Sequence, residues 1–118
     1  MDLGLTTRRA DTGEGDGVPV VACTGELDLT TAPRLRDALL RLATAGERRV
    51  VADLSGIVFI DSIGLGVVVA SLKRFRALGG ELYVVIGDRI RTPFEITGLT
   101  AAFPLYTSVD DATTASRA

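Results

Sequence analysis

Residues 49–66 constrain the fold more than any other part of the sequence, because they join a strand pattern directly to a helix pattern. The segment begins with a nearly continuous apolar run over residues 50–54, followed by a predicted turn at Ser55-Gly56 and a second apolar run over residues 57–60. Asp61-Ser62 comes next, where apolar residues begin to recur with helical spacing. Asp and Ser are residue types that cap a helix N-terminus. The segment therefore predicts a buried strand that leads into a helix at an exposed polar pair.

Ser62 is the first candidate functional residue, because the free N–H groups and the positive dipole end at a helix start favour an anion. A phosphate on the Ser62 hydroxyl would be tolerated there, and we hypothesise that Ser62 is a phosphorylation switch. The competing interpretation is that Ser62 only caps the helix. Gly64 and Gly66 argue against it, since each glycine destabilises a helix by up to about 1 kcal/mol relative to alanine. Close approach of another backbone explains two glycines in a first turn better.

Apolar patterns before this segment predict two strands and a helix. Residues 3–9 suit a short strand, residues 11–17 an exposed turn, and residues 18–24 a second strand that pairs with the first as an antiparallel hairpin. A helix capped by Thr30 or Thr31 follows, with Pro33 acceptable in its first turn and Gly46 at its end. Its buried stripe has helical spacing and consists of Leu35, Ala38, Leu39, Leu42 and Ala43.

The helix that begins at Ser62 carries an apolar stripe on one face and ends at Gly79-Gly80. Its opposite face is predicted to be solvated and includes Lys73, Arg74 and Arg76. An acidic partner surface is the alternative explanation for these three cations. Residues 81–86 form another near-continuous apolar strand, as expected when both faces of a sheet are covered.

The last third of the chain predicts three short elements. A helix over residues 88–97 should end at Gly98. If this helix began at Asp88, Pro93 would break one of its hydrogen bonds, so the alternative start is Thr92-Pro93. Residues 103–106 suit a brief edge strand. Thr107 or Ser108 then begins a terminal alanine-rich helix.

Strands that alternate with helices after residue 30 imply parallel pairing with right-handed crossovers. The chain has 118 residues, enough to bury a core without disulfides or metals, and it contains no internal repeat or linker. We therefore expect an α/β fold with a single domain over residues 1–118. Its mixed sheet should have about five strands, with an antiparallel strand at the N-terminus, and about four helices.

Composition argues against several classes of function. The net charge of −2 and the pI near 5.0 do not suit a nucleic-acid binder. No apolar run approaches the roughly 18 residues of a membrane span, and the start of the chain lacks a signal-peptide pattern, so we expect a cytoplasmic protein without membrane contact. Histidine is absent and Cys23 is the only cysteine, which removes the usual catalytic pairs and zinc ligands. We expect no enzyme activity, cofactor or metal, and Cys23 should act as a small hydrophobe.

Three motifs, in this order and spacing, resemble those of a known family. Gly25-Glu26-Leu27-Asp28 follows an early strand, Asp61-Ser62-x-Gly64-Leu65-Gly66 follows the central strand, and Ile96-Thr97-Gly98-Leu99 precedes Phe103-Pro104. The sequence resembles the STAS-domain anti-sigma factor antagonists, the anti-anti-sigma proteins of bacterial partner-switching systems. The resemblance covers nearly the whole chain, its middle motif is the most specific, and it implies a STAS-type fold.

The resemblance also implies a regulatory binding function. In such proteins, the serine at the position of Ser62 is phosphorylated by an anti-sigma factor that is itself a serine kinase. The unphosphorylated form binds that anti-sigma factor and releases the sigma factor, and a PPM-type phosphatase restores the active form. Ser62 is then the phospho-acceptor. The implied partner-binding surface combines its neighbours with an acidic loop and consists of Glu26, Leu27, Asp28, Asp61, Ser62, Ile63, Gly64, Leu65 and Gly66.

Two residues depart from the family pattern. Ile63 stands where the family usually has a second Ser or Thr, which leaves a single acceptor hydroxyl. Pro93 lies in what is commonly a helix and puts the local geometry there in question. Glu26 and Asp28 also have a simpler interpretation, as solvated residues of a turn.

Two other functions stay open at this point. A STAS domain also occurs as a regulatory or scaffold subunit of a transporter or a sensory complex, where modification of the serine would be incidental. A small nucleotide-binding or phosphotransfer enzyme would use the helix start as an anion cradle. However, neither GxGxxG nor GxxxxGK[ST] is present, and Ile60 replaces the glycine of a nucleophile elbow. The regulatory binding module is the favoured prediction.

Overall fold

The computed structural model describes residues 2–117 and contains a five-stranded sheet in the order β1-β2-β3-β4-β5. β1 pairs with β2 in antiparallel fashion, whereas β2, β3, β4 and β5 are parallel neighbours. The predicted mixed sheet with an antiparallel N-terminal strand is therefore confirmed. The strands are β1 (Leu3–Ala10), β2 (Val18–Leu27), β3 (Arg49–Ile60), β4 (Glu81–Ile86) and β5 (Leu105–Tyr106).

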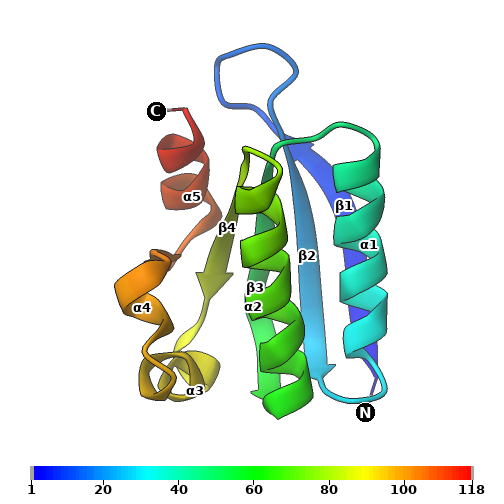
Figure 1. The fold of residues 1–118 in the computed structure, drawn as a ribbon, viewed down its shortest axis with the longest axis vertical. Helices are drawn as coiled ribbons and strands as arrows, with labels where there is room; N and C mark the ends of the chain where they lie inside the picture. Colours follow the sequence, from blue (N-terminus) through cyan, green and yellow to red (C-terminus); the bar gives the residue numbers. More distant parts are fainter. Residues whose placement is uncertain (1, 118) are drawn as a thin grey trace.

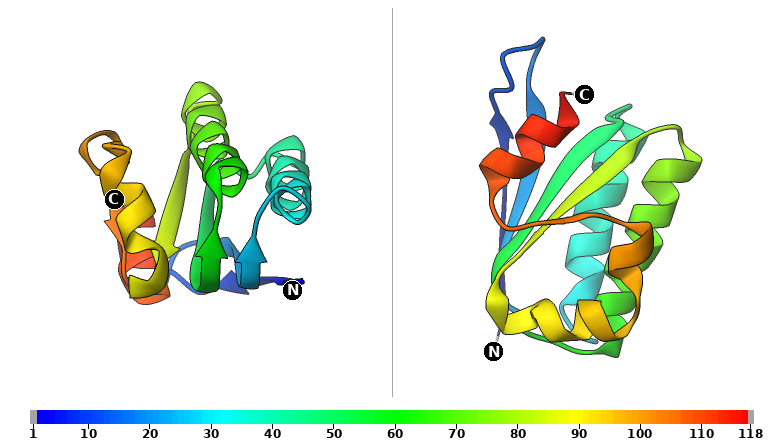
Figure 2. Two further views of the ribbon diagram at one scale, coloured as in Figure 1. Left: turned by 90° about the horizontal axis from the view of Figure 1, so that it is seen from below. Right: turned by 90° about the vertical axis from the view of Figure 1, so that its left-hand side faces the viewer.

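Helices cover both faces of this sheet (Figures 1 and 2). α1 (Ala32–Thr44) and α2 (Ser62–Ala77) lie side by side on one face, and α5 (Val109–Ser116) lies on the other. The 3-10 helix η1 (Asp88–Ile90), α3 (Arg91–Ile96) and α4 (Leu99–Ala102) connect β4 to β5. The described residues thus form five α-helices where about four were expected. The additional one, α4, is a single turn that follows Gly98.

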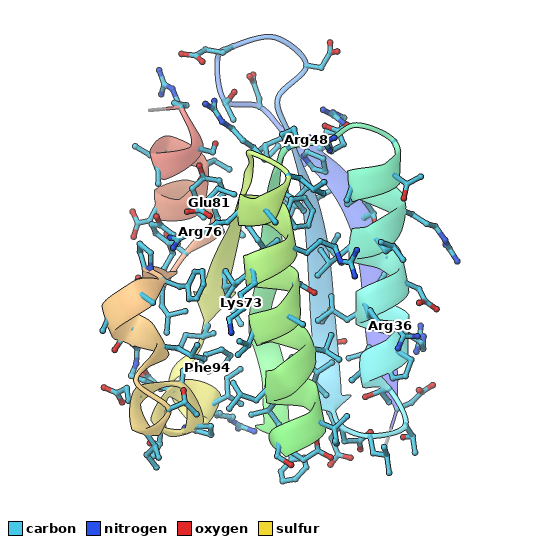
Figure 3. The ribbon with its side chains drawn as sticks, viewed as in Figure 1. Arg36, Arg48, Lys73, Arg76, Glu81 and Phe94 are labelled. Atoms are coloured by element: carbon cyan, nitrogen blue, oxygen red, sulfur yellow. The ribbon has the colours of Figure 1, made fainter. Side chains whose placement is uncertain are left out.

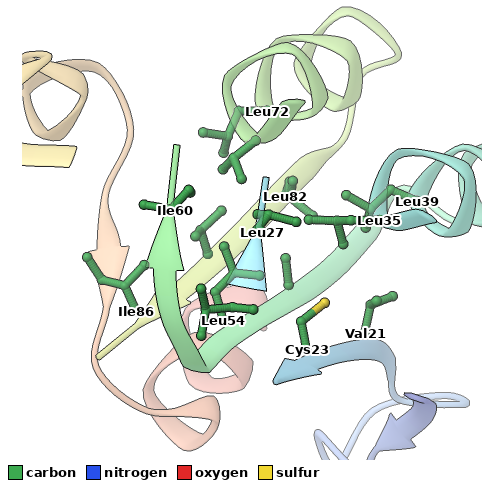
Figure 4. Packing of buried hydrophobic residues seen from close by; sticks show 14 of the residues in the cluster. Val21, Cys23, Leu27, Leu35, Leu39, Leu54, Ile60, Leu72, Leu82 and Ile86 are labelled. Atoms are coloured by element: carbon green, nitrogen blue, oxygen red, sulfur yellow. The ribbon is translucent and has the colours of Figure 1, made fainter. Parts of the chain in front are cut away.

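Two apolar clusters result from this layering. The larger lies between the sheet and the α1/α2 layer and includes Leu27, Leu35 and Leu72 (Figure 4). The smaller lies beneath α5 and includes Val51, Val85 and Ala112. β3 and β4 therefore have apolar residues on both faces, which explains the nearly continuous hydrophobic runs in their sequences.

The predicted turn at Ser55-Gly56 is wrong, because β3 continues without interruption from Arg49 to Ile60. The register between β2 and β3 shifts there by one residue, which marks a β-bulge. The Asp53 carboxylate accepts hydrogen bonds from the Ser55 amide at 3.1 Å and from the Ser55 hydroxyl at 2.6 Å. A residue pair with turn chemistry thus bends a strand instead of ending it.

Pro93 is accommodated because the expected helix over residues 88–97 is divided. η1 ends at Ile90 and α3 begins at Arg91, which places Pro93 in the first turn of α3. The N–H groups of a first helical turn have no partner within the helix, so proline loses no hydrogen bond there. The edge strand is shorter than predicted, with two residues, and Ser108 caps α5 as one of the two predicted candidates.

Candidate functional site

The candidate site lies where β2 and β3 end, at the lower edge of the molecule in Figure 1. Both strands are parallel, so their carboxyl ends meet there, and α1 and α2 begin close by. Glu26 is the register partner of Phe59, and Leu27 is the partner of Ile60. The acidic corner and the Asp61-Ser62 motif, which are more than thirty positions apart in the sequence, are therefore neighbours.

Asp61 joins the two segments. It is the N-cap of α2, and its Oδ1 accepts a hydrogen bond from the Gly64 amide at 2.7 Å. Its Oδ2 accepts another from the Leu29 amide, in the loop before α1, at 3.0 Å. The Asp61 amide donates to the Leu27 carbonyl oxygen at 3.2 Å. Asp61 therefore fixes the β2–α1 loop against the start of α2, in addition to capping the helix.

Ser62 is the first residue of α2 and is exposed. Since Asp61 provides the cap, the Ser62 hydroxyl is not needed for that role. The first-turn N–H groups and the dipole of a 16-residue helix give this position a positive potential. The geometry therefore presents an accessible hydroxyl in an environment that tolerates added negative charge.

The loop from Asp28 to Thr31 is organised around the Asp28 carboxylate. Its Oδ1 accepts hydrogen bonds from the Thr30 hydroxyl at 2.9 Å, the Thr30 amide at 3.0 Å and the Thr31 amide at 3.1 Å. These bonds, above all the one from the Thr30 hydroxyl, lower the pKa of Asp28. Asp28 thus keeps its charge and fixes the conformation of the loop. The interpretation of Asp28 as a simple solvated turn residue does not account for these hydrogen bonds.

Two of the predicted partner-binding residues, Leu27 and Gly64, are buried. The Leu27 side chain has no exposed surface and belongs to the larger core. A Cβ atom at Gly64 would lie 2.2 Å from the Leu27 carbonyl oxygen, so the backbone that requires this glycine belongs to the same chain. Both residues therefore support the surface around Ser62 through packing inside the domain. Gly66 is exposed, and a Cβ there would have no neighbour within 4 Å.

Exposed apolar side chains flank Ser62, and two of them were missed by the sequence reasoning. Ile63 is 47% exposed, Phe59 is 49% exposed and Leu29 is 66% exposed. Phe59 looked buried because it stands in an apolar run. However, β4 pairs with β3 only as far as Leu54, so the end of β3 projects beyond its neighbour. The sequence carries no local signal for where that pairing stops.

No group of three or more His, Cys, Asp or Glu side chains with the geometry of a metal site occurs within residues 2–117. Over the same residues, no helix is both long and apolar enough to cross a membrane.

Comparison with known proteins identifies the family. The STAS domain model matches residues 9–112. The anti-sigma-B factor antagonist of Staphylococcus aureus strain NCTC 8325 / PS 47 is 41% identical over 76 residues, which span 64% of this chain and 70% of that protein. The crystal structure of an anti-sigma factor antagonist from Mycobacterium paratuberculosis superposes with a TM-score of 0.85 at 34% identity, over 99% of this chain and 96% of the other.

A more distant structure shares the fold. The phosphorylated form of SpoIIAA, a Bacillus cell fate determinant, has a TM-score of 0.69 at 18% identity, and the match covers 92% of this chain and 96% of that one. The motif order, the mixed sheet with helices on both faces, and these matches lead to one assignment. The chain belongs to the STAS domain family and, within it, to the anti-sigma factor antagonists.

Proposed function

We propose that the unphosphorylated chain binds an anti-sigma factor through the surface around Ser62 and thereby releases the sigma factor. The anti-sigma factor is a serine kinase that phosphorylates Ser62, which ends the binding, and a PPM-type phosphatase removes the phosphate. The observation that carries this proposal is the exposed Ser62 at the start of α2, on a surface that Asp61 holds together. In this scheme the chain is a binding module and a kinase substrate rather than an enzyme, and it acts in the cytoplasm.

The apolar residues beside Ser62 would provide much of the affinity. Leu29, Phe59 and Ile63 are exposed, and Leu29 belongs to the polar loop from Asp28 to Thr31. Complete burial of a fully exposed side chain of this size contributes about 1.5–3 kcal/mol, and Phe59 and Ile63, which are about half covered already, would contribute about half of that. An apolar centre with a polar rim is the usual composition of a protein interface. Ile63 would add contact area where the family usually has a second hydroxyl.

The phosphoryl transfer requires only one hydroxyl on this chain. A bond forms between Ser62 Oγ and the γ-phosphorus of ATP, the bond to the bridging oxygen breaks, and ADP leaves. The hydroxyl proton passes to a base of the kinase. The product carries about −1.5 to −2 charges near neutral pH, beside the carboxylate of Asp61 and near that of Asp28.

This added charge is sufficient to exchange partners without refolding. A surface that accommodates a neutral hydroxyl must desolvate the new dianion and place it near existing carboxylates, which costs several kcal/mol. Each 1.4 kcal/mol changes affinity about tenfold. The helix N-terminus stabilises the phosphate in the free protein. The modified domain should therefore keep its fold and lose its partner.

Candidate ATP-dependent anti-sigma kinases from the same genome provide the test. The wild type, Ser62→Ala and Ser62→Glu are compared by calorimetric binding, and the modified residue is mapped by mass spectrometry. We expect Ser62→Ala to bind like the wild type and to stay unmodified, and Ser62→Glu to bind at least about tenfold more weakly. Thr44→Ala, an exposed change at the far end of α1, serves as the control. Equal affinity for all three forms, or modification at another residue, would contradict the proposal.

A further inference from the structure

A groove of about 260 Å³ opens between α1 and α2 directly beside Ser62. Ser62, Gly66 and Ala70 line it from α2, at intervals of four residues that place them on one helix face. Their small side chains leave the groove open. Arg36 lines the groove from α1, and no acidic residue is among the described residues that line it. Arg36 and the candidate phospho-acceptor Ser62 thus line one groove.

Arg36 is only weakly held where it stands. Within residues 2–117, its ion-pair partner is Asp37, the next residue of the same helix, at 3.2 Å from Nη2 and 3.3 Å from Nε. The side chains of both residues are more than half exposed, at 58% and 52%. Exposed ion pairs of this kind contribute little to stability. The Arg36 guanidinium is therefore available for a stronger acceptor.

We propose that Arg36 binds the phosphoryl group of phosphorylated Ser62 across this groove and exchanges its contact with Asp37 for one with the phosphate. The inference rests on the proposed function, since it requires phosphoserine at position 62. The planar guanidinium matches phosphate oxygens in a bidentate geometry that the lone Asp37 contact lacks. The first-turn N–H groups of α2 add to the positive potential at the same place.

The position of Arg36 distinguishes it from the other basic residue of the groove. Arg36 belongs to the lower part of α1, at the end of the molecule where α2 begins (Figure 3). Arg74 also lines the groove, but it stands twelve residues after Ser62 on α2, which is about 18 Å along the helix axis. Arg74 is therefore remote from a phosphate on Ser62, whereas Arg36 lies towards the end of the groove where α2 begins.

This contact changes what the modified surface presents to a partner. The phosphate and the guanidinium together occupy the groove next to Ser62, and Asp37 is left exposed. Phosphorylation thus adds negative charge at the start of α2 and also closes the gap between the two helices. Both effects oppose the binding of a partner that fits the open groove.

The test installs phosphoserine at position 62 by genetic encoding, so that no kinase is needed. The second pKa of the phosphate is measured by ³¹P NMR in the otherwise unchanged chain and in the Arg36→Gln variant. The nearby carboxylates Asp61, Asp28 and Asp37 act on this pKa in both proteins, so the difference isolates Arg36. We expect Arg36→Gln to raise the phosphate pKa by about 0.5–1 unit, since a nearby cation favours the dianion.

Two matched controls accompany the measurement. Arg41→Gln removes an exposed arginine of α1 that does not line this groove, and Arg74→Gln removes the distant arginine that does. Both should leave the phosphate pKa unchanged, and circular dichroism confirms that each variant is folded. An unchanged pKa in Arg36→Gln, or a larger shift in Arg74→Gln, would overturn the inference. Failure of every kinase to modify Ser62 would instead count against the proposed function alone.

Discussion

At the residue scale, the two glycines of the central motif have different physical roles. Gly64 is buried in the first turn of α2, where a Cβ atom would meet the Leu27 carbonyl oxygen at 2.2 Å and its carbon at 2.9 Å. Both atoms are backbone and cannot move without shifting β2. A Cβ at Gly66 would meet open space. One glycine is thus required by the fold, and the other is free for a role in binding.

This difference predicts opposite effects on stability. Gly64→Ala should lower the free energy of unfolding by about 2 kcal/mol or more, because overpacking against backbone forces a structural shift. Gly66→Ala should raise it by about 0.5–1 kcal/mol, because alanine is the better helix former and has room. Urea denaturation of both variants beside the wild type measures the two changes. Similar effects of the two substitutions would contradict the assignment.

Affinity for the anti-sigma factor provides a second measurement for Gly66. If a partner backbone approaches α2 closely there, Gly66→Ala should weaken binding to the anti-sigma factor while stabilising the isolated chain. A variant that gains stability and loses affinity separates a binding role from a structural one, which neither measurement does alone.

At the scale of elements, Arg76 ties three parts of the chain together. From the last turns of α2, its Nε lies 2.9 Å from Glu81 Oε2 at the start of β4 (Figure 3). Its Nη1 donates to the Ala102 carbonyl oxygen at 3.1 Å, and its guanidinium lies 4.3 Å from the centre of the Phe103 ring. The sequence placed Arg76 on a solvated face, but it anchors the segment between α4 and β5.

Loss of this anchor should loosen that segment before it unfolds the domain. Arg76→Ala should lower global stability by only about 1 kcal/mol, since the ion pair is partly exposed and a cation–π contact contributes a similar small amount. Hydrogen exchange should accelerate most at the Phe103 amide, which donates to the Leu99 carbonyl oxygen. Lys73→Ala, on the same helix and exposed, is the control. Uniform acceleration across the sheet would show that Arg76 has no local anchoring role.

At the scale of the whole molecule, Cys23 reports on the integrity of the larger core. Its side chain is 1% exposed and lies among residues that join the sheet to α1 and α2 (Figure 4). Burial, with a smaller contribution from the Asp53 carboxylate, raises the pKa of the Cys23 thiol to about 12. The folded chain therefore keeps a proton on this sulfur under conditions in which the unfolded chain releases it.

The resulting pH dependence has a definite sign. Above the ordinary thiol value of 9.0 the unfolded chain binds fewer protons at Cys23 than the folded chain, so stability falls as pH rises from 9.0 towards 12. Cys23→Ala should remove this contribution and flatten the decline. Tyr83 and Tyr106, whose pKa values burial also raises, titrate equally in both proteins. Urea denaturation over this pH range measures the stability of the wild type and of Cys23→Ala. Parallel profiles of stability against pH would show that Cys23 does not cause the decline.

The order and type of the main elements followed from local sequence patterns. The stripe on α1, the apolar run of β4 and the polar pair before α2 each depend on residues within a few positions of one another, so one window of sequence contains the physical cause. The same holds for Asp61 and Ser62 as the start of a helix. The family motifs then assigned a function to that start.

The composition of the surface around Ser62 depended on contacts that no local window contains. Phe59 is exposed because β4 stops pairing with β3 at Leu54, and Gly64 is required because β2 ends beneath α2. Arg36 and Ser62 share a groove only because two helices pack side by side. The sequence by itself determined the order of the main elements and the capped start of α2, since these depend on periodicity and capping. The tertiary structure decided which side chains surround that position, because strand register and helix packing are set by distant residues.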